Sequence, residues 1–132
     1  MAQIFTGTFR RSLDGKNRIM VPSEVRDALS PDDRSGLFLI PSKACVFLWP
    51  KSYLLRYAGE KGSDPIGNLA FNRSFFSRAI FKSFDGAGRI VLPGELAGRF
   101  PQGELLIAGA GLYLEAWEPA RWAAQVPELD LD

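Results

Sequence analysis

Short apolar runs, separated by residues that favour turns, divide the first half of the chain into predicted strands and short helices. The turn Asp14-Gly15-Lys16-Asn17 stands between two such runs, which predicts a hairpin. Pro22 ends the second run because proline lacks the N–H that a sheet needs, and a short helix can begin at Ser23. The predicted elements are, in chain order, strands at 4–9 and 18–21, a helix at 23–29, strands at 37–40 and 44–49, and a helix at 51–57.

The second half of the chain repeats this order after a glycine-rich segment. Residues 59–67 contain three Gly and one Pro and predict a linker. Apolar residues at helical spacing predict an amphipathic helix over 68–78. The elements that follow are strands at 80–84 and 89–92 around a turn at 85–88, a helix at 95–100, strands at 104–108 and 112–117, and a helix at 120–126.

A single register relates the two halves. Residues 9–26 read FRRSLDGKNRIMVPSEVR and residues 80–99 read IFKSFDGAGRIVLPGELAGR. An offset of 71 positions superposes, without a gap, Ser12 on Ser83, Asp14 on Asp85, Gly15 on Gly86, Arg18 on Arg89, Ile19 on Ile90, Pro22 on Pro93 and Glu24 on Glu95. The match indicates an internal duplication. Because a half of about 60 residues would have few core positions alone, we expect the two halves to pack about a pseudo-two-fold axis into one core, in a mainly β (α+β) protein.

Charge is distributed unevenly along the 132 residues, although the net charge is only +1. Residues 1–26 hold five Lys or Arg against two acidic residues, residues 71–99 hold the same numbers, and residues 100–132 hold one basic residue against six acidic ones. Two matched basic segments can attract a polyanion while the acidic end repels it. They can equally form a solvated face, and charge alone does not decide between these two interpretations.

The composition argues against an enzyme. The sequence has no His, and its one cysteine, Cys45, lies in an apolar run that favours a buried hydrophobe over a nucleophile or metal ligand. The adjacent carboxylates Asp32 and Asp33 fall in a predicted polar loop, where solvated charge is the expected role. Neither GAG segment continues into a phosphate-loop motif, so no cofactor is predicted. No apolar run is long enough to span a membrane, and the N-terminus does not resemble a secretory signal, so we expect a cytoplasmic protein.

The pattern Asp-x-x-x-Arg occurs twice, each time at a predicted turn. In a structural interpretation, Asp14 accepts N–H groups of its turn and pairs with Arg18, and Asp85 does the same with Arg89. In a functional interpretation, the aspartate orients the arginine toward a phosphate or a guanine edge. Both can hold at once. The basic residues that flank the turns and could contact phosphates are Arg10, Arg11, Lys16 and Lys82.

At these residues the sequence resembles the MraZ family of bacterial transcriptional regulators, which are tandem relatives of the SpoVT/AbrB swapped-hairpin domains. The resemblance rests on LDGKNRIMVPSEVR, on DGAGRIVLPGEL, and on the Trp-Pro features FLWP and LEAWEP. It implies two swapped-hairpin repeats, 1–58 and 79–132, joined by a linker and helix at 59–78, that share a β-barrel-like core.

The resemblance also implies a function. A member of this family is expected to be a cytoplasmic, nucleoid-associated repressor that binds direct repeats in double-stranded DNA upstream of the division and cell-wall gene cluster, including its own operon. The family forms ring-shaped homo-oligomers. The DNA-binding signature falls on Asp14, Lys16, Arg18, Asp85 and Arg89. Two positions depart from it: Asn17 replaces a glycine but tolerates left-handed backbone, and Ala87 leaves the second turn without a lysine, which suggests unequal contributions from the halves.

Two other classes of function remain open. The chain could be an antitoxin-like protein interaction module of the same fold, in which Phe71, Phe75 and Phe76 dock a partner. Their helical spacing fits a core or a subunit interface better. An enzyme is the weakest alternative, because neither a His nor a convincing pair of carboxylates is present.

Overall fold

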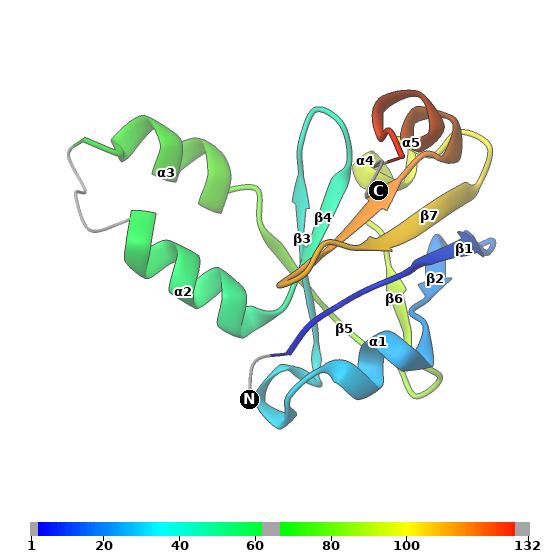
Figure 1. Ribbon diagram of the computed structural model, residues 1–132, viewed down its shortest axis with the longest axis horizontal. Helices are drawn as coiled ribbons and strands as arrows, with labels where there is room; N and C mark the ends of the chain where they lie inside the picture. The colour runs from blue at the N-terminus through cyan, green and yellow to red at the C-terminus, as the bar shows by residue number, and fades with distance from the viewer. Residues whose placement is uncertain (1–2, 62–66, 129–132) are drawn as a thin grey trace.

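A computed structural model describes residues 3–61 and 67–128 of the chain (Figure 1). The strands are β1 (Thr8–Ser12), β2 (Arg18–Met20), β3 (Gly36–Pro41), β4 (Val46–Trp49), β5 (Ile80–Ser83), β6 (Arg89–Val91), β7 (Glu104–Gly109) and β8 (Leu114–Trp117). The helices are α1 (Ser23–Ala28), the 3-10 turn η1 (Pro31–Asp33), α2 (Lys51–Lys61), α3 (Leu69–Phe76), α4 (Gly94–Ala97) and α5 (Pro119–Gln125). The protein is α+β with antiparallel pairing between the named strands, as the sequence predicts.

Six strands form one sheet in the order β1-β7-β8-β4-β3-β5. The two predicted hairpins that contain the buried apolar runs are confirmed, since β3 pairs with β4 and β7 pairs with β8. These hairpins meet at the centre of the sheet, where β4 pairs with β8. The edges are β1 and β5, the strands that carry Arg10, Arg11 and Lys82. Charge on edge strands hinders pairing with another molecule.

The strands on either side of each Asp-x-x-x-Arg turn do not pair with each other, in contrast to the simple hairpins predicted from the local pattern. β1 pairs with β7, so that Thr8 lies opposite Ala108, and β5 pairs with β3. β2 and β6 leave the large sheet and pair together as a two-stranded ribbon. Backbone hydrogen bonds close each turn. Beyond the turn the two strands diverge, and each pairs with a strand from the other half of the chain.

The β2–β6 ribbon lies over the core. Ile19 pairs with Ile90, and neither side chain is exposed. The ribbon is closed at its ends by two matching hydrogen bonds, Val21 N–H to Gly88 O at 3.1 Å and Leu92 N–H to Asn17 O at 2.8 Å. Beneath it, the main core gathers buried aliphatic residues from both halves, among them Leu29, Leu37, Leu39, Leu48, Leu105, Ile107 and Leu114. Neither half contains this core alone.

Several bounds and burials differ from the predictions. β1 covers 8–12 rather than 4–9, because pairing with β7 uses the backbone and accepts Arg10 and Arg11. α2 continues to Lys61 and so takes in the start of the predicted linker, while residues 62–66 of that linker lie outside the described residues.

Asp33 is buried and not solvated. Its carboxylate accepts hydrogen bonds from the Ser52 N–H at 3.0 Å and from Gln3 Nε2 at 2.7 Å, and it also bonds the Ser52 hydroxyl. Asp33 therefore satisfies a free N–H in the first turn of α2.

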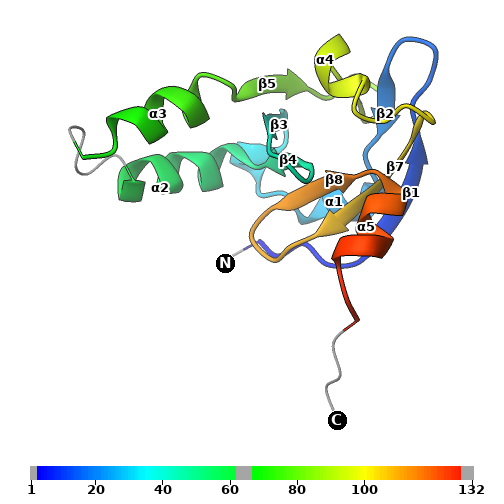
Figure 2. The ribbon, with the colours of Figure 1, turned by 90° about the horizontal axis from the view of Figure 1, so that it is seen from above.

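Helices α2 and α3 lie side by side and project from one side of the sheet (Figures 1 and 2). A second cluster of buried and half-buried side chains, mostly aromatic, joins them to the sheet. Trp49 is at its centre, with ring contacts to Tyr53, Tyr57, Phe75 and Tyr113 at centroid distances of 4.7 to 5.4 Å. Phe75 and Phe76 are thus packed within the protomer. Within the described residues, none of the helices could cross a lipid bilayer by its length and hydropathy.

Candidate nucleic-acid interface

The first turn is organised by the carboxylate of Asp14. Its Oδ1 accepts hydrogen bonds from the N–H groups of Lys16 and Arg18, each at 2.9 Å, and its Oδ2 accepts one from Arg18 Nε at 2.6 Å. The Asp14 N–H donates back to Arg18 O at 3.0 Å. One side chain thus sets both the backbone of the turn and the direction of the arginine. The hydrogen bonds and ion pairs of the described residues leave the two terminal nitrogens of Arg18 free.

The second turn repeats this arrangement. Asp85 Oδ1 accepts from the N–H groups of Ala87 and Arg89 at 2.9 Å, and its Oδ2 accepts from Arg89 Nε at 2.8 Å. These are the ion pairs that the structural interpretation of the sequence predicts. Both aspartates remain about one third exposed, so their salt bridges add little to stability and mainly fix geometry.

Left-handed backbone occurs at the same place in both turns. Asn17 has φ +59° and Gly88 has φ +86°. The prediction that Asn17 tolerates this conformation in place of a glycine is confirmed. The carbonyl groups of these two residues accept the hydrogen bonds that close the ribbon, so the turn geometry and the pairing of β2 with β6 depend on each other.

The hydrogen bonds also shift the acidity of the aspartates. The Arg18 N–H, together with the Lys16 N–H and the Arg18 side chain, lowers the pKa of Asp14 from 3.8 to about 2. The pKa of Asp85 is lowered in the same direction, chiefly by the Arg89 N–H. Both carboxylates are therefore charged over the whole physiological range and keep holding their arginines.

Four side chains lie on the outer face of the ribbon. Arg18 stands opposite Val91, and Met20 stands opposite Arg89. Directly opposite residues of an antiparallel pair point to the same side, so all four face away from Ile19 and Ile90. Arg18 and Arg89 occupy diagonal positions, whose Cα atoms lie about 7–8 Å apart in an antiparallel ladder. The ribbon therefore presents two oriented guanidinium groups beside two exposed apolar side chains.

The other predicted contact residues are placed less uniformly. Lys16 is exposed at the first turn beside Arg18. Arg11 reaches the ribbon, where its Nε donates to Met20 O at 3.1 Å. Arg10 points to the opposite face of β1 because successive strand residues alternate. Lys82 lies opposite the buried Leu37, half-buried on β5, and no hydrogen bond or ion pair of the described residues ties it to the ribbon.

Comparison with known proteins identifies the family. Residues 75–131 match the family model described as "MraZ protein, putative antitoxin-like". The chain is 33% identical to the transcriptional regulator MraZ of Pediococcus pentosaceus, over 96% of this chain and 90% of the relative. It is 32% identical to that of Thermomicrobium roseum, over 92% and 87%, and 34% identical to that of Aromatoleum aromaticum, over 92% and 86%. The chain belongs to the MraZ family. The names of these MraZ relatives describe regulators, which agrees with the prediction that the chain is not an enzyme.

Two basic residues near the second turn of this MraZ chain were not predicted as site residues from the sequence. Arg26 of α1 donates from Nε to Val21 O at 3.1 Å, and its guanidinium lies against Gly88. Arg34 donates from Nε to Leu29 O at 2.9 Å and is exposed. Both line a hollow with Asp85 and Gly86. Arg26 is one of the five basic residues of segment 1–26, whereas Arg34 lies outside that segment. Neither position beside the second turn could be read from the sequence, because it depends on how β2 and β6 pair.

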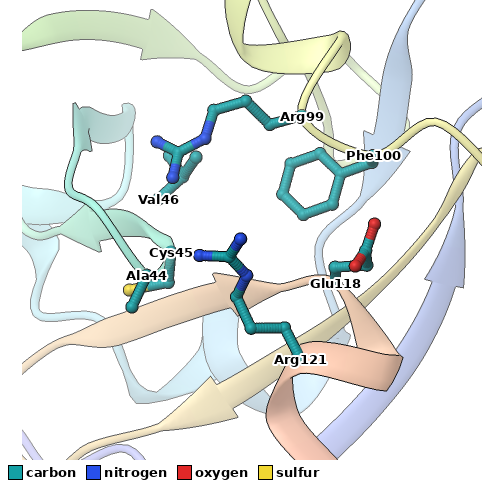
Figure 3. A pocket seen from close by; sticks show the side chains of 7 residues that line it. All are labelled: Ala44, Cys45, Val46, Arg99, Phe100, Glu118 and Arg121. Atoms are coloured by element: carbon teal, nitrogen blue, oxygen red, sulfur yellow. The ribbon is translucent and has the colours of Figure 1, made fainter. Parts of the chain in front are cut away.

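A separate cavity of 220 Å³ lies away from the turns, between the β3–β4 connection and the ends of α4 and α5 (Figure 3). Arg99 and Arg121 both donate to Lys43 O, at 3.2 and 2.9 Å, and so hold that connection in place. Burial raises the pKa of the Cys45 thiol to about 11, so the thiol is protonated and behaves as the buried hydrophobe predicted. The described residues contain no group of three or more potential metal ligands.

Proposed function

We propose that this protein is a sequence-specific DNA-binding transcriptional regulator and that the β2–β6 ribbon enters the major groove. The observation that carries the proposal is the outer face of the ribbon, where Asp14 and Asp85 hold Arg18 and Arg89 by Nε and leave their terminal nitrogens to a ligand. A two-stranded ribbon fits the major groove, and an arginine fork matches the O6 and N7 acceptors of guanine or a phosphate. The names of the MraZ relatives support the same function.

Membership of the family supports finer expectations. We propose that the protein binds direct repeats in double-stranded DNA upstream of the division and cell-wall gene cluster, and represses transcription of its own operon. It would then act in the cytoplasm, associated with the nucleoid. Lys16 and Arg11 would supply phosphate contacts beside the arginines, since both are at the ribbon or its turn. Arg10 and Lys82 are weaker candidates for the same role.

We further propose that the chain consists of two SpoVT/AbrB-like swapped-hairpin repeats, 1–58 and 79–132, joined by the segment 59–78. Three features support this division. The two Asp-x-x-x-Arg turns have the same hydrogen bonds at the same offset in the sequence. The closing bonds at Gly88 and Asn17 are reciprocal. The strands next to the turns pair across the halves rather than within them.

The apolar surface of the projecting helices favours assembly into a ring-shaped homo-oligomer. Leu55 is 62% exposed on α2, and Leu69 and Phe71 on α3 are 45% and 38% exposed. Ile80 and Phe81, on the edge strand β5, are 40% and 38% exposed. Where exposed large apolar side chains gather into a contiguous patch, the patch is typical of an interface. In a ring, neighbouring subunits would present their ribbons to successive repeats of the DNA.

The test is a fluorescence-anisotropy titration of the protein against the DNA upstream of its own gene. Wild type, Arg18→Ala and Arg89→Ala are compared at two salt concentrations, with Arg73→Ala as the control because Arg73 is exposed on α3, away from the ribbon. We expect tight, salt-sensitive binding by wild type and the control, and loss of preference for the operator in both ribbon variants. Unchanged affinity of Arg18→Ala would remove the ribbon as the DNA site.

The second candidate function is an antitoxin-like protein interaction module, which the description of the matching family model favours. Phe71 is the exposed member of the three phenylalanines proposed for this role, since Phe75 and Phe76 are packed in the aromatic cluster. Recovery of one stoichiometric protein partner by the purified chain, lost in Phe71→Ala, together with no binding to its upstream DNA, would favour this candidate.

A further inference from the structure

The residues of the two turns differ in net charge. At the first turn, Lys16 and Arg18 accompany one carboxylate, Asp14. At the second turn, Ala87 takes the place of the lysine, so Arg89 and Asp85 balance each other. If the turns were the whole DNA-binding surface, the second would be held to a phosphate backbone much less strongly than the first.

Arg26 belongs to the first half of the chain but lies on the second turn. Its guanidinium occupies the space that a side chain at Gly88 would need, with Nε and Nη1 only 2.6 Å from the position of an ideal Cβ. The hydrogen bond from Nε to Val21 O fixes the direction of the group. Gly88 therefore gives Arg26 room to lie directly over the turn that carries Asp85 and Arg89.

Arg34 lines the same hollow as Arg26 and Gly88. The hollow between them has a volume of 530 Å³ and includes Asp85 and Gly86. Arg34 is also held by Nε, through its hydrogen bond to Leu29 O. Asp27 is the remaining charged residue of this lining. Neither Arg26 nor Arg34 forms an ion pair with any of the described residues, so both keep their terminal nitrogens for a ligand.

The positions beside the first turn that correspond to Arg26 and Arg34 are Ala97 and Gln102. The offset between the halves places Ala97 where Arg26 stands. Leu13 donates its N–H to Gly103 O at 2.7 Å, and Phe84 donates its N–H to Ser35 O at 2.9 Å. Gly103 therefore corresponds to Ser35, and the exposed Gln102 corresponds to Arg34. Both counterparts are uncharged, so the extra cations serve the second turn alone.

We propose that Arg26 and Arg34, together with Arg89, form a binding site for the DNA phosphate backbone beside the second turn. The site rests on the proposed DNA-binding function. It contains three cations against Asp85 and Asp27, which gives the second turn the same excess of one positive charge that Lys16 gives the first. Two planar forks, each fixed by one nitrogen, suit a phosphate oxygen better than mobile lysines would. The first half of the chain thus completes the contact surface of the second.

The experiment measures the salt dependence of affinity for the upstream DNA between 50 and 200 mM salt. It compares wild type, Arg34→Gln, the double variant Arg26→Gln/Arg34→Gln, and the control Arg56→Gln on α2. Each lost phosphate contact lowers the logarithmic salt slope by about 0.9. The affinity of the double variant should therefore fall about tenfold less over this range than that of wild type, with an unchanged ratio between operator and scrambled DNA.

A gain-of-charge variant keeps the test independent of any folding defect at Arg26. Gln102→Arg places an arginine beside the first turn at the position equivalent to Arg34, and it should steepen the salt slope by about 0.9. If the slopes of Arg34→Gln, the double variant and Gln102→Arg equal that of wild type while Arg18→Ala loses specific binding, the phosphate site is refuted and the proposed function stands. If wild type does not bind the DNA, both are overturned.

Discussion

Replacement of Gly88 by alanine tests whether the left-handed backbone of the second turn is required. A non-glycine residue at φ +86° costs roughly 1–2 kcal/mol. The new methyl group would also displace the Arg26 guanidinium, whose hydrogen bond to Val21 O contributes about 0.5–1.5 kcal/mol. The free energy of unfolding should therefore fall by about 1.5–3.5 kcal/mol in Gly88→Ala.

Gly86 is the matched control, because it lies in the same turn without a left-handed φ and an added Cβ would meet nothing within 4 Å. Gly86→Ala should change the stability by less than about 0.5 kcal/mol. The assay is urea unfolding followed by tryptophan fluorescence, at one protomer concentration because assembly would couple to unfolding. In an Arg26→Ala background the cost of Gly88→Ala should drop to the backbone part alone, about 1–2 kcal/mol. Equal stability of Gly88→Ala and Gly86→Ala would refute the reasoning.

Three further predictions concern stability. Hydrogen bonds lower the pKa of Asp14 from 3.8 to about 2, so its stabilising contribution is complete above pH 3.8 and is lost as the pH falls toward 2. The difference in urea midpoint between wild type and Asp14→Asn should therefore shrink over that range. Ile90→Ala should lower the free energy of unfolding by about 2–5 kcal/mol, and Ile90→Val by about 0.5–1.5, since Ile90 is fully buried; similar urea midpoints for the two variants would contradict the packing. Asp33→Ala should cost about 1–3 kcal/mol by leaving the Ser52 N–H unpaired, while the exposed Asp32→Ala should be neutral, and equal thermal midpoints would contradict this role of Asp33.

The parts of the site that the sequence predicts well are local. A carboxylate four residues before an arginine, with Gly or Asn between them, determines a tight turn through hydrogen bonds within five residues. The paired interactions of Asp14 with Arg18 and the left-handed conformation of Asn17 were therefore foreseen. The hairpins β3–β4 and β7–β8 were foreseen for the same reason, since each joins neighbouring strands by a short connection.

The parts that escaped prediction depend on pairing between distant segments. The apolar pattern indicates that strands lie before and after the first turn, although it places β1 at 4–9 instead of 8–12. It does not show which strands they pair with, and β1 and β2 both pair with strands of the second half. The placement of Arg26 on the second turn follows from that pairing. Asp33 was expected in solvent because its neighbours are polar, yet it is buried since Gln3 and the start of α2 supply its hydrogen-bond donors.

The pairing of strands across the two halves has a consequence for folding during synthesis. Thr8 pairs with Ala108, so β1 leaves the ribosome long before its partner β7 exists. At about 5–20 residues per second, roughly 5–20 s pass between the synthesis of Thr8 and that of Ala108. For most of this time the local β3–β4 hairpin can form, whereas β2 still lacks its partner β6. Contacts of such long sequence separation slow folding, so maturation finishes only after synthesis is complete. In that interval, the second half of a neighbouring nascent chain offers the same strands, and chains translated from one messenger can become intertwined.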